Sequence, residues 1–306
     1  MSKRLRLFTH TDLDGIGCSV LAMIAFGRGN VDVDYCNYDD IDQKVIEYFN
    51  SNKLDECHIT DIRVSQDLAH KIAQSNKNFR LIDHHKSALD LNEHIWCEVQ
   101  THRNTDGLET SGTELYYEYL SEMGHIVKSS SLDAFVDIVT NYDTWRWNSL
   151  GEDGLICKQI NSLLYIFGRD MFINWCYETI LDDSFPRILD TEKLILSLEQ
   201  QKIDKYIEDK DKYLMTGYID SRPCGFIYAE SYISELGNKL CLKHPELDLI
   251  VIINMDGYVS YRTVKDNIDL SQIAKKFGGG GHIKAAGSQL SQLQREVSIN
   301  VLFNER

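Results

Sequence analysis

Short apolar strands alternate with amphipathic helices through the first half of the chain, and this alternation restricts the fold more than any other feature. Four strand-like segments are expected, at residues 5–8, 31–36, 56–60 and 79–82. Three segments with helical periodicity separate them, at about 15–26, 41–51 and 64–75. Alternating β and α units of this kind predict a parallel sheet with helices on both faces. The first half is therefore predicted to be a doubly wound α/β domain.

A long charged segment divides the two halves. Residues 190–213 are rich in Glu, Lys, Leu and Gln and contain neither Gly nor Pro, which favours one continuous helix. Strand-like segments follow at 224–230, 248–256 and 258–264, with helical segments at 231–242 and 270–276. These predict a smaller α/β unit. We expect a first domain at 1–189, a helical linker at 190–214 and a second domain at 215–306, with a cleft between the domains.

Composition limits the partners and the compartment. No stretch approaches the roughly 20 apolar residues that span a bilayer, and the N-terminus reads as a strand, not as a signal peptide. The eight cysteines include no C-x-x-C pair, which argues against a zinc ribbon and fits a reducing compartment. We therefore expect a cytoplasmic protein without a membrane partner. The net charge of −15 argues against binding long duplex nucleic acid but allows a small anionic substrate beside bound cations.

Three residues with metal-ligand chemistry follow the first strand. His10, Asp12 and Asp14 alternate in the sequence THTDLDG. In an extended chain such residues point to one side, and open α/β sheets place their sites beyond the carboxyl ends of their strands. On its own the motif is equally consistent with a solvated, Asp-rich turn.

Further Asp and His residues occur at the ends of later elements. Asp61 ends the third strand-like segment, and Asp83, His84 and His85 follow the fourth. Asp143 lies at the end of a helix predicted at about 132–142, where the helix dipole disfavours negative charge. A bound cation would explain an aspartate in that position.

Together these residues predict a two-metal site. Oxygen and imidazole ligands without thiolate suit Mn²⁺, Mg²⁺ or Fe²⁺. Four carboxylates packed together would repel one another strongly without cations. Two metal ions about 3.5–4 Å apart are a common arrangement for in-line attack on phosphorus, so the pattern indicates a metal-dependent phosphoesterase.

The order of the motifs HTDLDG, TDI, DHHKS and NYD resembles the DHH phosphoesterase family, whose name-giving triplet is here Asp83-His84-His85. The sequence FGGGGHIKAAG at 277–287 is similar to the glycine-rich motif of the substrate domain in one branch of that family. The resemblance covers nearly the whole chain. Within the branch, the compact two-domain form is most similar to the nano-RNases, oligoribonucleases of the B type.

This resemblance implies a role for each candidate residue. The implied metal ligands are His10 and Asp12 for one ion, Asp14, His84 and Asp143 for the other, and Asp61 as the carboxylate that bridges both. Mn²⁺ is the favoured metal, with Mg²⁺ or Fe²⁺ as alternatives. Asp83 is implied to orient the neighbouring histidine, and His85 to contact the scissile phosphate.

The second domain contributes candidate substrate residues. Glycines at 278–281 let backbone N–H groups approach a phosphate, and Arg262 could grip one with two donors. From the residues alone, a flexible turn and a surface arginine are the simpler interpretation. The resemblance favours phosphate and nucleotide binding by Arg262, Gly279, Gly280, Gly281 and His282.

The leading hypothesis is hydrolysis of short single-stranded RNA to mononucleotides. Alternatives are a 3′,5′-bisphosphonucleotide phosphatase, a phosphodiesterase for linear or cyclic dinucleotides, and a non-enzymatic nucleotide sensor. The oligomeric state stays open, a homodimer included. Trp145, Arg146 and Trp147 could stack a base, although packing around the preceding helix is the simpler role. Ser111 to Glu114 fits a helix capping box, which is sufficient to explain it.

Overall fold

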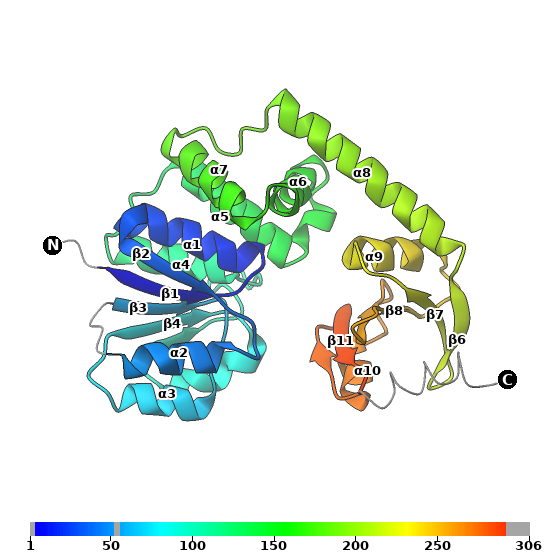
Figure 1. Cartoon of the computed structure of the whole chain (residues 1–306), viewed down its shortest axis with the longest axis horizontal. Coiled ribbons are helices and arrows are strands. Elements are labelled where there is room, and N and C mark those ends of the chain that lie inside the picture. Colours follow the sequence, from blue (N-terminus) through cyan, green and yellow to red (C-terminus); the bar gives the residue numbers. More distant parts are fainter. Residues whose placement is uncertain (1–3, 52–55, 292–306) are drawn as a thin grey trace. The chain divides into compact units, whose positions relative to one another are not determined.

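The computed structural model describes residues 4–51 and 56–291 (Figure 1). The chain divides into two compact units, one up to Leu196 and the other from Ser197. The boundary falls inside helix α8 (Asp190–Asp211), which is continuous as its composition predicted. The predicted domain limits at 189 and 214 stay predictions, and the last 15 residues of the predicted second domain, 292–306, lie outside the described residues.

A five-stranded parallel sheet forms the centre of the first unit, in the order β2-β1-β3-β4-β5. Its strands are β1 (Leu5–Thr9), β2 (Val31–Tyr35), β3 (Glu56–Thr60), β4 (Phe79–Asp83) and β5 (Cys97–Val99). The chain winds outward from β1 to β2 and then crosses to β3 on the other side of β1. This reversal creates a switch point between β1 and β3, where doubly wound sheets bind their ligands at the carboxyl ends of the strands.

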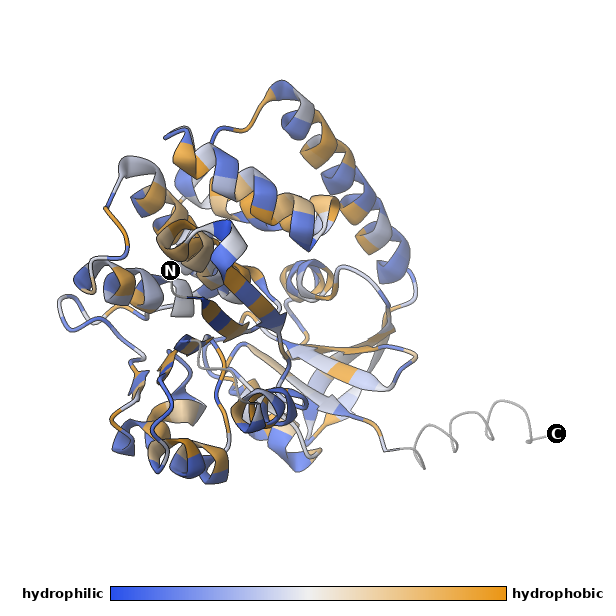
Figure 2. Cartoon of the chain, turned by 60° about the vertical axis from the view of Figure 1, so that its left-hand side comes forward, coloured by the Kyte–Doolittle hydropathy of each residue, from blue (hydrophilic) through white to orange (hydrophobic). Residues whose placement is uncertain are grey.

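Helices cover both faces of this sheet (Figure 1). On one face lie α1 (Leu13–Phe26), α4 (Gly112–Glu122), α5 (Ser130–Asp143), α6 (Glu152–Phe167) and α7 (Arg169–Leu181). On the other lie α2 (Ile41–Asn50), α3 (Gln66–Ala73) and the 3₁₀ helix η2 (Lys86–Glu93). Two further 3₁₀ turns are η1 (Arg28–Asn30) and η3 (Arg146–Ser149). The helices show mixed apolar and polar bands, as expected for one core-facing and one solvent-facing side (Figure 2). The predicted doubly wound α/β fold is confirmed.

The second unit contains a six-stranded mixed sheet in the order β10-β11-β9-β8-β7-β6. Its strands are β6 (Met215–Ile219), β7 (Arg222–Tyr228), β8 (Leu249–Ile253), β9 (Tyr258–Arg262), β10 (Gly280–Gly281) and β11 (Ala285–Gln289). Helices α9 (Ile233–Lys243) and α10 (Leu270–Lys276) accompany them. Strands β8 and β9 form an antiparallel hairpin, and Gly257 in its turn has φ +86°, which glycine tolerates. The predicted smaller α/β unit is confirmed.

All eight cysteines are free and buried, and burial raises the pKa of the Cys36 thiol to about 11, which keeps it protonated. Within 4–51 and 56–291, no helix is both long and apolar enough to cross a membrane.

Candidate metal centre

The first group of site residues lies in the turn from β1 into α1. His10 directly follows β1, and Asp12 caps α1 by accepting a hydrogen bond from the Gly15 N–H at 3.1 Å. Asp14 follows in the first turn of the helix. A Cβ on Gly15 would lie 2.3 Å from the His10 carbonyl oxygen, so only glycine permits this tight turn. The turn places all three side chains at the carboxyl end of β1.

Asp61 follows β3 in an unusual backbone conformation. Its φ of +56° lies in the left-handed region, which is uncommon for a residue with a side chain. Its backbone N–H donates to the Ile82 carbonyl at 3.0 Å, which fixes the turn against β4. The side chain is 1% exposed. Conformations of this kind persist where surrounding structure enforces them, often at functional sites.

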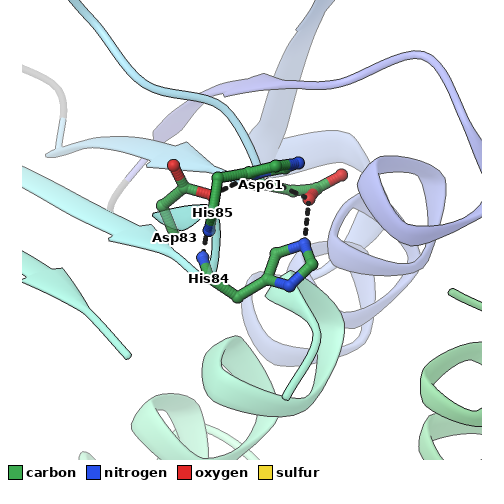
Figure 3. Close-up of side chains that lie close together, drawn as sticks. All are labelled: Asp61, Asp83, His84 and His85. Atoms are coloured by element: carbon green, nitrogen blue, oxygen red, sulfur yellow. Dashed lines mark hydrogen bonds and ion pairs between the residues drawn. The ribbon is translucent and has the colours of Figure 1, made fainter. Parts of the chain in front are cut away.

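The triplet after β4 is organised by its aspartate. Asp83 Oδ1 accepts hydrogen bonds from the His84 backbone N–H at 2.8 Å and from His85 Nδ1 at 2.7 Å (Figure 3). Burial would lower the pKa of His85, but the hydrogen bond and charge of Asp83 outweigh burial and raise it. The contact also turns His85 Nε2 away from Asp83. Asp83 therefore holds the His85 ring, and the roles that the resemblance implied for Asp83 and His85 stay predictions.

Asp14 is held by residues from α4. The backbone N–H groups of Gly112 and Thr113 donate to its two oxygens at 2.6 and 2.8 Å. Ser111 caps the same helix, accepting from the Glu114 N–H at 3.1 Å as predicted. The capping interpretation was incomplete, because the same turn also positions a site carboxylate. This role could not be read from a motif, since about 100 residues separate the partners.

The structure brings all six predicted metal ligands into two groups. One group is His10, Asp12 and Asp61, and the other is Asp14, His84 and Asp143, with the potential ligand atoms of each within 4.8 Å of one another. A third group within the same limit is Asp61, Asp83, His84 and His85. Asp61 faces the first two groups. Its Oδ2 lies 4.0 Å from His10 Nδ1. Its Oδ1 lies 3.2 Å from His84 Nε2, a contact that Figure 3 shows. A carboxylate in this position can bridge two cations.

Buried atoms without hydrogen bonds support cation binding. Asp61 Oδ2 and His84 Nε2 are buried and have no hydrogen-bond partner among the described residues, and His10 Nδ1 is buried 2.8 Å from Asp12 Oδ2. Buried polar atoms are otherwise almost always paired, because desolvation without compensation is costly. All three are lone-pair donors that divalent ions accept. The donor set therefore fits a pair of hard or borderline divalent ions.

The charges of the clustered carboxylates also favour cation binding. Burial and the neighbouring charges of Asp14 and Asp12 raise the pKa of Asp61, and the same causes raise that of Asp143. For Asp12, burial favours the neutral form, but the hydrogen bond and charge of His10 outweigh it and lower the pKa to about 2. Repulsion among these carboxylates is the condition that bound divalent cations relieve.

Tyr38, in the loop between β2 and α2, was missed by the sequence analysis. Its hydroxyl lies 3.2 Å from His85 Nε2, and its ring centroid lies 5.5 Å from that of His10. Of its side chain, 55% is exposed. Nothing in the local sequence distinguishes this tyrosine from a surface residue, because its contact is with a segment 47 residues further along the chain.

Arg262 lies at the end of β9 in the second unit. Its Nη1 donates to the Tyr261 carbonyl at 2.9 Å and its Nη2 to Ser234 Oγ at 3.3 Å. Its Nε is buried and has no partner in the described part of the chain. A Cβ on Gly237 would lie 2.4 Å from Arg262 Cγ, so α9 packs closely on this side chain. Arg262 is thus a half-buried residue whose buried Nε–H has no partner in the described part of the chain, rather than a free surface arginine.

The glycine-rich motif forms a tight hairpin with β11. A Cβ on Gly279 would lie 2.0 Å from the Gly287 carbonyl oxygen, and one on Gly281 would lie 2.6 Å from Ala286 Cα. Gly280 is exposed and has open space where its Cβ would be. His282 follows and donates its backbone N–H to Ala285 at 2.8 Å. Packing alone therefore requires Gly279 and Gly281, whereas Gly278 and Gly280 are exposed and have open space where a Cβ would be.

The chain is similar in sequence to a known bacterial nuclease. No protein-family model matches the chain. Oligoribonuclease NrnB of Bacillus subtilis is 36% identical to it, over 97% of this chain and 75% of NrnB.

Solved structures agree on the fold. RecJ of Thermus thermophilus in complex with Mn²⁺ matches 98% of this chain and 51% of its own, with a TM-score of 0.65 at 11% identity. The pGpG-specific phosphodiesterase PggH of Vibrio cholerae matches 98% of both chains, with a TM-score of 0.53 at 12% identity. At such identities the likeness concerns the fold alone. The extended similarity to NrnB, together with the fold and the His/Asp cluster, shows that this chain belongs to the DHH phosphoesterase superfamily.

Proposed function

We propose that this protein is a metal-dependent oligoribonuclease that hydrolyses short single-stranded RNA to mononucleotides. The observation that carries the proposal is the 36% identity to oligoribonuclease NrnB, which extends over 97% of the chain. The cluster of His and Asp residues at the carboxyl ends of β1, β3 and β4 supports it, because a phosphodiesterase of this type needs such ligands.

Two divalent ions are proposed for the cluster. His10 and Asp12 would hold one ion, Asp14, His84 and Asp143 the other, and Asp61 would bridge them. Bound ions of this kind polarise the phosphodiester and lower the pKa of a coordinated water. We favour Mn²⁺, and the structural neighbour RecJ was solved with Mn²⁺ and with Mg²⁺.

The chain's own groups orient the reaction. Asp83 accepts from His85 Nδ1 and so directs His85 Nε2 toward Tyr38 Oη, where it would also meet a phosphate oxygen. Tyr38 Oη lies 3.2 Å from the same nitrogen and limits the orientations of the ring. The N–H groups of Gly112 and Thr113 hold Asp14 in one orientation, which preorganises the ligand set.

The second unit is proposed to bind the substrate. Arg262 retains a buried donor without a partner, and a phosphate oxygen would satisfy it. Gly280 is exposed and leaves open space beside the backbone, and His282 follows it in the same hairpin. Gly279 and Gly281 would contribute by allowing the hairpin to form. Binding of a distal phosphate or terminus in this unit would favour oligonucleotides of a few residues.

Linear or cyclic dinucleotides are the second candidate substrate class, supported by the shared fold with the pGpG-specific PggH. A 3′,5′-bisphosphonucleotide substrate and a nucleotide-sensing role are the remaining alternatives from the sequence. The free, buried cysteines fit a reducing compartment, so we propose a cytoplasmic location.

One rate comparison tests the proposal. The protein is incubated with Mn²⁺ and labelled RNAs from about 2 to 24 nucleotides, cyclic dinucleotides and a 3′,5′-bisphosphonucleotide. We expect the highest kcat/KM on the shortest RNAs, with mononucleotide products. Asp61→Asn serves as the inactive control. Faster cleavage of a cyclic dinucleotide or bisphosphonucleotide would replace the proposed substrate, and nucleotide binding without any hydrolysis would favour the sensor.

A further inference from the structure

Trp145, just beyond the candidate metal centre, has a strained backbone. Its φ is +61°, in the left-handed region that a bulky residue rarely adopts and that favours glycine. Its side chain is nevertheless large and 45% exposed. Core packing therefore does not account for a tryptophan here. Strained residues of this kind gather at functional sites, where the surrounding structure enforces them.

Of the two neighbouring tryptophans, Trp147 is packed against another ring and Trp145 is partly exposed. Trp147 stacks on Tyr142, with ring centroids 6.0 Å apart and an interplanar angle of 14°. Trp145 lies at 5.9 Å from Trp147 with an angle of 32°. Trp147 thus has the packing role that the sequence predicted. Trp145 ends the row, and part of its surface is open to a further flat ring.

Arg146, between the two tryptophans, has unused donors. Its Nε and Nη1 are buried and have no hydrogen-bond partner within the residues that the structure describes. A buried charged donor without a partner is costly, and an anionic oxygen is the group that satisfies a guanidinium best. A ring open to stacking and a guanidinium with free donors are therefore adjacent.

This pair lies close to the candidate metal ligands. Asp143, one of those ligands, precedes Trp145 by two residues, so their Cα atoms are at most about 7.6 Å apart. Asp143 Oδ2 in turn lies 3.7 Å from His84 Nε2. A nucleotide with its phosphate at the metal centre therefore has its base within reach of this segment.

We propose that Trp145 and Arg146 form a nucleotide-binding subsite on the metal-binding unit. The indole stacks on the base of a nucleotide that adjoins the scissile phosphate, and the guanidinium donates to a phosphate oxygen of that nucleotide. This inference rests on the proposed function. Every base has a stacking face, so the subsite selects nucleotides without selecting their sequence.

Paired substrates and paired variants test the stacking role. The substrates are an RNA dinucleotide and the same molecule with one base removed from either nucleoside. Trp145→Gly removes the ring and also relieves the left-handed backbone, so its melting temperature should equal or exceed that of the wild type. Its kcat/KM should fall roughly 5- to 150-fold on the dinucleotide but stay unchanged on the abasic form that lacks the stacked base. Trp145→Phe keeps a ring and should retain most activity.

Arg146 has its own control. Arg146→Gln should lower kcat/KM on the dinucleotide and on both abasic forms, whereas Arg146→Lys should recover part of the loss because it keeps the charge. Metal content should stay at the wild-type value in all four variants.

Binding of the product separates this inference from the proposed function. Wild type should bind AMP more tightly than ribose 5-phosphate in calorimetric titrations, and Trp145→Gly should abolish that difference. A wild type that cleaves no RNA would refute the oligoribonuclease function and leave this binding test decisive. Equal dinucleotide rates for wild type and Trp145→Gly, or an equal loss on the dinucleotide and both abasic forms, would overturn the stacking role.

Discussion

Gly112 provides a sharp test of how α4 supports the metal centre. It is the first residue of α4, and its N–H donates to Asp14 Oδ2 at 2.6 Å. An alanine Cβ at this position would lie 2.6 Å from Asp61 Cβ, 3.0 Å from Asp61 Cα and 3.1 Å from Asp14 Oδ2. Asp61 cannot retreat easily, because its backbone is fixed by β4 and its side chain is buried. Gly112→Ala must therefore move α4 away from two candidate ligands.

The size of the effect follows from two contributions. Overpacking typically costs about 1–3 kcal/mol, and the higher helix propensity of alanine offsets up to about 1 kcal/mol of this. A net loss of about 2 kcal/mol would lower the melting temperature by about 4–8 °C for a unit of this size. Displaced hydrogen bonds to a ligand should lower Mn²⁺ affinity about 10- to 100-fold.

Calorimetric titration with Mn²⁺ and thermal melting measure both effects. Gly29→Ala is the matched control, because no atom lies within 4 Å of its added Cβ. We expect Gly29→Ala to match the wild type in both measurements. If Gly112→Ala binds Mn²⁺ as tightly as wild type, the contact between α4 and Asp14 does not organise the metal site.

Three further predictions concern charge, orientation and substrate binding. In chelator-treated protein at pH 7, Asp61→Asn should melt about 2 °C or more above wild type. A carboxyl group with a raised pKa binds more protons folded than unfolded, so its charge lowers stability as pH rises above the ordinary value; an unchanged difference between pH 3 and pH 7 would contradict this. Tyr38→Phe should keep full metal content and lower kcat/KM roughly 2- to 10-fold, because one hydrogen bond to His85 is lost. Arg262→Ala and His282→Ala should keep both metal ions and lose about one to two orders of magnitude in kcat/KM on RNAs of 2 to about 5 residues; undiminished cleavage by both would exclude them as substrate residues.

Most of the candidate metal ligands could be predicted because they follow the carboxyl ends of strands. His10, Asp61 and His84 each follow an apolar strand, and parallel strands bring their carboxyl ends to one edge of the sheet. Their proximity therefore follows from fold class alone. Asp143 was predicted from a local rule as well, since it ends α5 where a negative charge needs compensation.

Contacts between distant segments could not be predicted in this way. Gly112 reads as an ordinary first helical residue, and only the packing of α4 against α1 explains why it must lack a side chain. Tyr38 follows β2 and His85 follows β4, and their contact forms although β1 and β3 lie between these two strands in the sheet order. Local patterns specify elements and their buried faces, whereas such pairs depend on how the elements are assembled.

Both candidate sites contain or adjoin a non-glycine residue with a positive φ. Among residues 4–51 and 56–291, the non-glycine residues with positive φ are Asp61, Trp145, Asp183, Asp220, Ser221 and Tyr232. Aspartate and serine in exposed turns tolerate this conformation, since their short polar side chains bond locally. The two aromatic residues have no such compensation. One is Trp145, beyond Asp143, and the other is Tyr232, directly before α9, whose Ser234 accepts from Arg262.

The strain at Asp61, Trp145 and Tyr232 costs of order 1–3 kcal/mol each, which is a large fraction of the stability of an ordinary domain. Asp61 is also buried among like charges, so charge repulsion destabilises the fold in addition to the backbone strain. We propose that a ligand supplies the missing interactions at two of these strained positions, by coordination at Asp61 and by contact with substrate at Trp145.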